Sequence, residues 1–154
     1  MTAANKLVFF EDKVIPDMNP TTRTKWLIEC NQCGNMFKVD EVNVDHVVGE
    51  FACTNREEFM SYLLSRLDVN FEDLQILCVD IPKKNHTGCH QIKTLSERMG
   101  ITFEEAKIEK EVIAICKLKA AQIDQWLSDR GIRVAKNPQA RRDAVREVLK
   151  NEHK

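Results

Sequence analysis

The sequence Cys30-Asn31-Gln32-Cys33 opens the part of the chain that decides the fold, and Cys78 and Cys89 close it. A Cys-x2-Cys pair is the usual first half of a tetrahedral zinc site. The other two cysteines lie far away in the sequence, so only a folded chain can bring four thiolates together. We therefore expect a structural zinc site with these four ligands, and His86 is the alternative to Cys89.

Length and composition favour a small metal-stabilised protein. The chain has 154 residues, of which 43% are hydrophobic and only 6% aromatic. A core of about 70 residues is marginal on its own, and a structural metal is a common remedy. We find no signal-peptide pattern and no apolar run near the length of a membrane span. These features favour a reducing cytoplasm without membrane attachment, where cysteine pairs bind metal more often than they form disulfides.

A second set of polar residues lies between and after the cysteines. Val44-Asp45-His46-Val47 is typical of a strand, and His90 follows Cys89 directly. A neutral imidazole such as that of His46 accepts a proton near neutral pH, which suits a general base. Asp45 offers a hard oxygen ligand for a divalent cation, and His90 offers a nitrogen. The alternative for His46 is an ordinary strand histidine with a satisfied hydrogen bond.

Together these motifs resemble the HNH endonuclease family, in its small zinc-containing bacteriophage version. The likeness spans about residues 24–98 and rests on four motifs. They are Cys30-x2-Cys33, Val44-Asp45-His46-Val47, Leu74-Gln75-Ile76-Leu77-Cys78 and Cys89-His90-Gln91-Ile92-Lys93-Thr94. The family usually closes its second pair as Cys-x2-Cys-His, whereas residues 79–88 separate the two cysteines in this chain.

The resemblance implies an α+β fold with a ββα-metal core and cleavage of DNA phosphodiester bonds in the host cytoplasm. His46 would be the general base, and Asp45 with His90 would bind Mg²⁺ or another divalent cation. Asp73 stands where the family has an asparagine that orients the base, and Asn70 or Asn55 are the alternatives. The competing interpretation is a catalytically inactive zinc-knuckle protein that binds DNA as an accessory factor.

Sequence patterns divide the chain into three parts. We expect residues 1–23 to contain a strand at 6–12 followed by a loop. We expect residues 24–100 to form the nuclease domain. Within that domain, the patterns predict strands at 36–39 and 42–48, a short apolar segment at 74–77 that leads to Cys78, and helices at 55–67 and 89–99. Val42, Val44 and His46 would share one face of their strand by the period of two.

Residues 101–154 predict a helical extension. Thr102 and Glu105 form a capping box at its start, and Pro138 begins its last helix. The segment from 120 to 150 loosely resembles a SAP-type DNA-binding motif, and a plain helical hairpin is the alternative. Residues 131–154 hold seven basic against three acidic side chains, a net charge of +4. We expect Arg141, Arg142 and Arg146 to be exposed there and to bind DNA.

Overall fold

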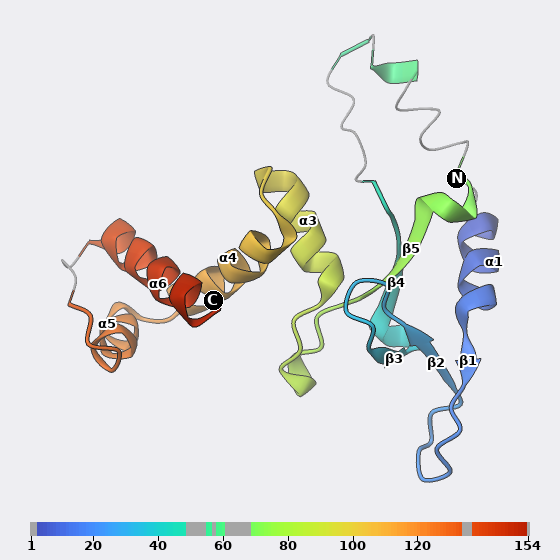
Figure 1. Cartoon of the computed structure of the whole chain (residues 1–154), viewed down its shortest axis with the longest axis horizontal. Coiled ribbons are helices and arrows are strands. Elements are labelled where there is room, and N and C mark those ends of the chain that lie inside the picture. The colour runs from blue at the N-terminus through green and yellow to red at the C-terminus, as the bar shows by residue number, and fades with distance from the viewer. Residues whose placement is uncertain (1–2, 49–54, 57, 61–68, 134–136, 154) are drawn as a thin grey trace. The chain divides into compact units, whose positions relative to one another are not determined.

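The computed structural model describes residues 3–48, 55–56, 58–60, 69–133 and 137–153, and it has an α+β fold (Figure 1). It contains two compact units, residues 1–94 and 95–154, each with its own packing. The predicted boundary at 100–101 lies later in the chain than this division. Within the described ranges, no helix is long and apolar enough to cross a membrane.

The N-terminal segment is helical, so the strand predicted at 6–12 is wrong. Helix α1 spans Ala3–Lys13, and its Phe9 side chain is buried. The Phe9 ring makes an edge-to-face contact with Phe71, with ring centroids 5.6 Å apart. The Lys13 ammonium, one helical turn after Phe9, lies over the same ring. Leu7 and Val8 remain exposed, because only one side of the apolar run faces the core.

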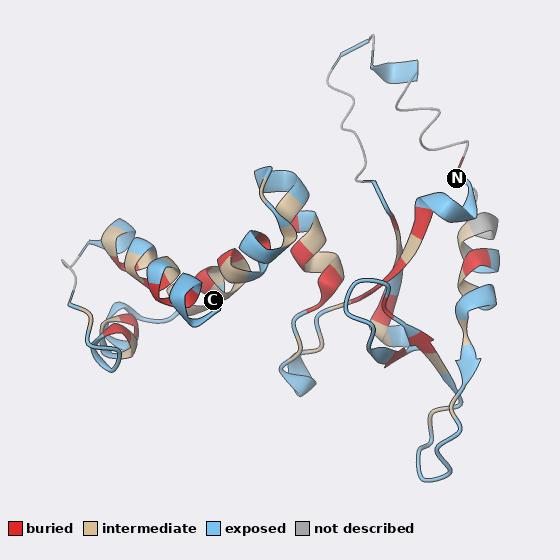
Figure 2. Ribbon diagram, viewed as in Figure 1, coloured by how far each residue is buried: buried red, intermediate tan, exposed pale blue. Residues whose placement is uncertain are grey.

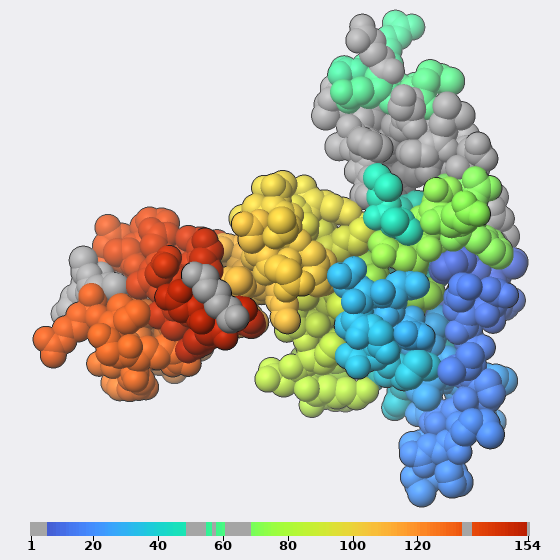
Figure 3. Space-filling model, viewed as in Figure 1, coloured from blue at the N-terminus to red at the C-terminus, as the bar shows by residue number. Residues whose placement is uncertain are grey.

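A three-stranded antiparallel sheet follows α1. Its strands are β1 (Ile15–Pro16), β2 (Trp26–Glu29) and β3 (Met36–Lys38), in that order. Ile28 and Phe37 are neighbours in the ladder and both are buried. The long β1–β2 connection projects from the sheet (Figure 3) and is held by its own polar side chains. The β2–β3 connection carries the first two cysteines.

Two further described strands and a helix follow β3, with short 3-10 helices among them. Strand β4 (Val42–His46) pairs with β5 (Leu74–Cys78) in an antiparallel register, and helix α3 spans Cys89–Met99. These bounds confirm the helix predicted at 89–99 and place the predicted strands closely. Val42 and His46 are buried at the two ends of β4, Asn43 is exposed, and Val44 and Asp45 are partly buried. This pattern agrees with the predicted shared face.

The helix predicted at 55–67 falls largely outside the described residues. At its start, the Asn55 Oδ1 atom accepts a hydrogen bond from the Glu58 N–H at 2.9 Å. This contact is the one expected of an N-cap asparagine.

The second unit is built from α4 (Phe103–Cys116), α5 (Ala120–Ser128) and α6 (Pro138–Glu152). The predicted capping box is present: Thr102 Oγ1 accepts from the Glu105 N–H, and the Glu105 carboxylate accepts from the Thr102 N–H. Asn137 caps α6 ahead of Pro138. The buried residues lie on the inward faces of the helices (Figure 2). They form one apolar cluster of Val112, Ile123, Leu127, Val145, Val148 and Leu149.

Candidate metal centre

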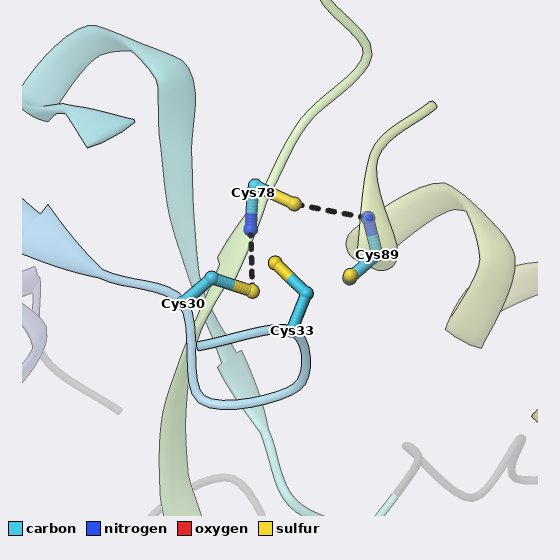
Figure 4. Close-up of side chains that lie close together, drawn as sticks. All are labelled: Cys30, Cys33, Cys78 and Cys89. Carbon is cyan, nitrogen blue, oxygen red and sulfur yellow. Dashed lines mark hydrogen bonds between the residues drawn. The ribbon is translucent and has the colours of Figure 1, made fainter. Parts of the chain in front are cut away.

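The four predicted cysteines meet at one place in the first unit. Cys30 and Cys33 come from the β2–β3 turn, Cys78 ends β5, and Cys89 begins α3. Their sulfur atoms point into one space and all lie within 4.8 Å of one another (Figure 4). A tetrahedral site with Zn–S bonds of about 2.3 Å has sulfur atoms about 3.8 Å apart, so a small contraction is enough. The four thiols can hold a metal ion.

The first cysteine pair is fixed by a compact turn. The Gly34 N–H donates a hydrogen bond to the Cys30 carbonyl at 2.9 Å, and the Cys30 N–H donates to the Asn35 carbonyl at 3.0 Å. Asn31 fastens this turn to β5 through two hydrogen bonds with Ile76, which lies two residues before Cys78. The turn and the third cysteine are therefore held in register by the protein itself.

The second pair meets because residues 79–88 form a closed loop. The Ile81 and His86 backbones exchange hydrogen bonds of 3.0 and 3.2 Å, and the Gly88 N–H donates to Asp80 Oδ1 at 2.7 Å. Gly88 lies so close to the start of the loop that an added Cβ would be 2.3 Å from the Val79 carbonyl carbon. The loop thus starts and ends at the same place, and Cys89 lies next to Cys78.

Cys30, Cys78 and Cys89 are buried and Cys33 is exposed, and backbone amides donate to two of the sulfur atoms. The Cys78 N–H donates to Cys30 Sγ at 3.4 Å, and the Cys89 N–H donates to Cys78 Sγ at 3.3 Å. Burial raises the pKa of Cys30, but backbone amides of Cys78, Cys33 and Gln32 outweigh this effect and the net pKa is lowered. Burial raises the pKa of Cys78 to about 11 and that of Cys89 still further.

The raised pKa values of Cys78 and Cys89 mean that these two thiols hold their protons near neutral pH when no cation is bound. Burial is the largest cause of the raised pKa in both, and the negative charges of neighbouring cysteines add to it. A divalent metal replaces the protons and removes this cost, because metal binding and thiol deprotonation are linked.

His86, the alternative fourth ligand, stands beside the cluster. Its Nε2 atom lies 3.3 Å from Cys78 Sγ, and its ring lies 5.0 Å from the Phe37 ring. In the Nε2–H tautomer the ring donates a hydrogen bond to the sulfur. His86 therefore contacts a cysteine of the cluster, while Cys89 occupies the fourth position.

Asp45 lies next to α3. Its Oδ2 atom is 3.3 Å from Lys93 Nζ, and its Oδ1 atom accepts a hydrogen bond from the His46 N–H at 2.9 Å. Lys93 follows His90 by three residues, so both side chains lie on the same side of α3. Asp45 therefore contacts α3 through a residue one turn after His90, and cation binding by Asp45 and His90 stays a prediction.

His46 follows Asp45 in β4, and neighbouring strand residues point to opposite faces. The His46 side chain is 8% exposed, and its Nε2 atom is enclosed by protein. The His46 carbonyl accepts a hydrogen bond from Gln75 Nε2 at 2.8 Å, which ties the end of β4 to β5. Its role as a general base stays a prediction.

Asp73 occupies the end of a short 3-10 helix, Phe71–Asp73, before β5. Its exposed carboxylate accepts a hydrogen bond from the Asn70 N–H at 2.9 Å. Its carbonyl accepts another from the Val47 N–H at 2.8 Å, next to His46. The backbone of Asp73 therefore supports the end of β4, whereas its predicted side-chain role toward His46 stays a prediction.

The prediction that the three arginines of α6 are exposed is wrong for Arg141, whereas Arg142 and Arg146 are partly exposed. Arg141 is buried and forms two hydrogen bonds with Asp124, at 2.6 and 2.8 Å. Arg142 and Arg146 both pair with Glu109, a buried carboxylate of α4. These arginines join the helices of the second unit, because each guanidinium meets an acid from another helix. DNA binding by them stays a prediction.

Three residues near the sites were given no role by the sequence patterns. Asn31 sits inside the first Cys-x2-Cys, Gly88 precedes Cys89, and Lys93 follows His90 by three. Only the last carried a usable signal, because i,i+3 spacing on a helix predicts a shared side. The contacts of Asn31 and Gly88 are with residues distant in sequence or across a loop, so local pattern does not reveal them.

Comparisons of the chain with protein-family models, with curated proteins and with solved structures found no match.

Proposed function

We propose that the four cysteines bind one structural zinc ion. Thiolates in a closed tetrahedral set are the ligands of structural zinc. Bound zinc would link the β2–β3 turn, the end of β5 and the start of α3, the three segments that the first unit has to hold together. Such sites contribute on the order of 10–16 kcal/mol in zinc-finger peptides, so the metal would dominate the stability of this small unit.

We further propose that the β-β-α part of this unit is the core of a metal-dependent DNA endonuclease. The observation that carries the proposal is the contact between Asp45 and α3. Asp45 Oδ2 lies 3.3 Å from Lys93 Nζ, and Lys93 follows His90 by three residues, a spacing that favours the same side of a helix. A carboxylate and an imidazole from these two elements are a donor set suited to a divalent cation.

In this proposal the residues divide the work of phosphodiester hydrolysis. Asp45 and His90 hold the cation, which would supply positive charge against the charge that develops on the phosphate. His46 accepts a proton from the attacking water. For this step the imidazole has to reach water, so the side chain or the residues that enclose Nε2 must move when DNA binds.

Plasmid cleavage tests the nuclease proposal. The zinc-loaded protein is incubated with supercoiled plasmid and Mg²⁺, Mn²⁺ or Ni²⁺, and with EDTA as a control. We expect metal-dependent nicking or linearisation by the wild type and none by His46→Ala. His153→Ala is a matched control, since His153 lies in the second unit beside Glu111. A His46→Ala protein with wild-type cleavage would remove the assignment of the base.

The second candidate is a zinc-knuckle protein that binds DNA without cutting it. It is favoured by the enclosure of His46 Nε2 and by the ion pair that Asp45 makes with Lys93. This candidate predicts a shift in DNA mobility that does not depend on added divalent cation, together with an intact plasmid in every metal.

A further inference from the structure

Lys93 links α3 to the end of β4 at the place where the proposed catalytic cation would bind. Its Nζ atom lies 3.3 Å from Asp45 Oδ2, and the two side chains are only 14% and 21% exposed. An ion pair so sheltered is screened less by salt than one at the surface. The Lys93 ammonium is therefore a positive charge held within ion-pair distance of the Asp45 carboxylate.

The residues around Asp45 fit a small divalent cation. A carboxylate supplies the hard oxygen that Mg²⁺ and Mn²⁺ prefer, and His90, three residues before Lys93 on α3, offers a nitrogen donor. The carboxylate already attracts one cation, the ammonium of Lys93. Two cations beside the same oxygen repel each other, so the ammonium and a divalent ion compete for Asp45.

We propose that Lys93 is a positioning residue that occupies the cation site in the free protein. Its ammonium neutralises Asp45 when the site lacks a divalent ion and leaves the carboxylate when one binds. The inference rests on the proposed function for the position of that ion. The released ammonium stays one helical turn after His90, where it can bind a phosphate oxygen of DNA. Lys93 thus weakens cation binding in the free protein and helps hold the substrate.

The test is a titration of the zinc-loaded full chain with Mn²⁺ in the absence of DNA. Free Mn²⁺ is followed by electron paramagnetic resonance. We expect Lys93→Gln to bind Mn²⁺ roughly fivefold more tightly or better, the size expected for loss of one ion-pair competitor. Lys93→Arg keeps the charge and should stay near the wild type. Lys84→Gln is the matched control, because Lys84 pairs with Glu41 elsewhere in the same unit.

Asp45→Asn locates the bound ion, since it should abolish Mn²⁺ binding in the wild-type and Lys93→Gln backgrounds. Zinc content and circular dichroism check each fold, and Lys93→Met replaces Lys93→Gln if the latter does not fold. Equal or weaker Mn²⁺ binding by the neutral variant overturns the inference, and so does an equal gain in Lys84→Gln. Absence of Mn²⁺ binding in both wild type and Lys93→Gln overturns it as well.

Plasmid cleavage by the same proteins separates this inference from the proposed function. One outcome is that Lys93→Gln binds Mn²⁺ more tightly, as predicted, but the wild-type protein never cuts DNA. This outcome contradicts the nuclease proposal and supports the role of Lys93. The other outcome is that the wild type cuts DNA but Lys93→Gln binds Mn²⁺ no more tightly than the wild type. This outcome contradicts the role of Lys93 and leaves the nuclease proposal standing.

Discussion

Asn31 and Ile76 are joined by two hydrogen bonds that run in opposite directions. The Asn31 N–H donates to the Ile76 carbonyl at 2.9 Å, and the Ile76 N–H donates to Asn31 Oδ1 at 2.6 Å. Ile76 is almost fully buried, so its amide has no ready access to water. The amide side chain therefore continues the β-ladder and fixes the cysteine turn against β5.

Replacing Asn31 with Ala should weaken the metal centre without touching a sulfur atom. The change leaves the buried Ile76 N–H without its acceptor, which costs about 1–3 kcal/mol. We expect a lower melting temperature and faster loss of zinc to a chelator. Asn35→Ala is the control, because Asn35 contributes its backbone carbonyl to the same turn. Identical zinc loss in the Asn31 and Asn35 variants would contradict the role of the Asn31 side chain.

Gly88→Ala should open the loop between Cys78 and Cys89. The new Cβ would meet the Val79 carbonyl carbon at 2.3 Å and the Asp80 nitrogen at 2.4 Å, so the backbone has to shift. We expect less than one zinc per chain and a destabilised first unit. Gly100→Ala is the comparison, since its φ of +64° brings strain but its Cβ would meet no atom within 4 Å. A fully zinc-loaded Gly88→Ala protein would show that the loop does not need this close approach.

The ion pairs of Glu109 should make the free energy of unfolding of the second unit depend on pH. Burial raises its pKa, but hydrogen bonds and charges from Arg146 and Arg142 outweigh burial, and the net pKa lies below its ordinary value of 4.5. The stabilisation by the ionised Glu109 is therefore complete at pH values above its ordinary pKa. It is lost as the pH falls through the lowered pKa of the folded state. Glu109→Gln should cost about 2 kcal/mol near neutral pH and flatten the acid dependence.

Fluorescence of Trp126 provides the measurement for Glu109. The chain has two tryptophans, Trp26 in the first unit and Trp126 beside the core of the second. In a Trp26→Phe background, denaturation at several pH values reports on the second unit alone. Asp143→Asn is the control, because Asp143 also contacts Arg146 but is 54% exposed. Parallel pH profiles for wild type and Glu109→Gln would contradict the assignment.

Lysine substitutions separate the structural role of the arginines from DNA binding. Lysine keeps the positive charge but lacks the planar fork that pairs with a carboxylate. If Arg142 and Arg146 act mainly through Glu109, the double Lys variant should lose stability and keep its affinity for DNA. A drop in affinity with unchanged stability, measured by fluorescence anisotropy over a range of salt, would favour direct contacts with DNA.

The sequence predicted best those features that depend on local pattern. Helix α3, the capping box at Thr102 and the proline at the start of α6 all have signals within a few residues. The clustering of the four cysteines could be predicted from their chemistry, because a Cys-x2-Cys pair with two more cysteines is the usual ligand set of a structural zinc ion. The pairing of β4 with β5 was not predicted, because the two strands lie about 30 residues apart and β5 is apolar and largely buried throughout.

Predictions failed where the deciding partner lies far away in the chain. The apolar run at 6–12 suits a strand, but packing of Phe9 on Phe71 favours a helix with one buried side. The arginines of α6 looked exposed because Glu109 and Asp124 belong to other helices. The contact between Lys93 and Asp45 needed the relative placement of β4 and α3.

Zinc content tests the central claim most directly. The protein is purified under reducing conditions, its fold is checked by circular dichroism, and zinc per chain is measured by elemental analysis. We predict one zinc per chain, retained in Cys116→Ser and lost in Cys33→Ser and Cys89→Ser. Cys116 lies in the second unit at the end of α4, so it is a matched control for the loss of a thiol. A folded, reduced wild-type protein without zinc would contradict the account.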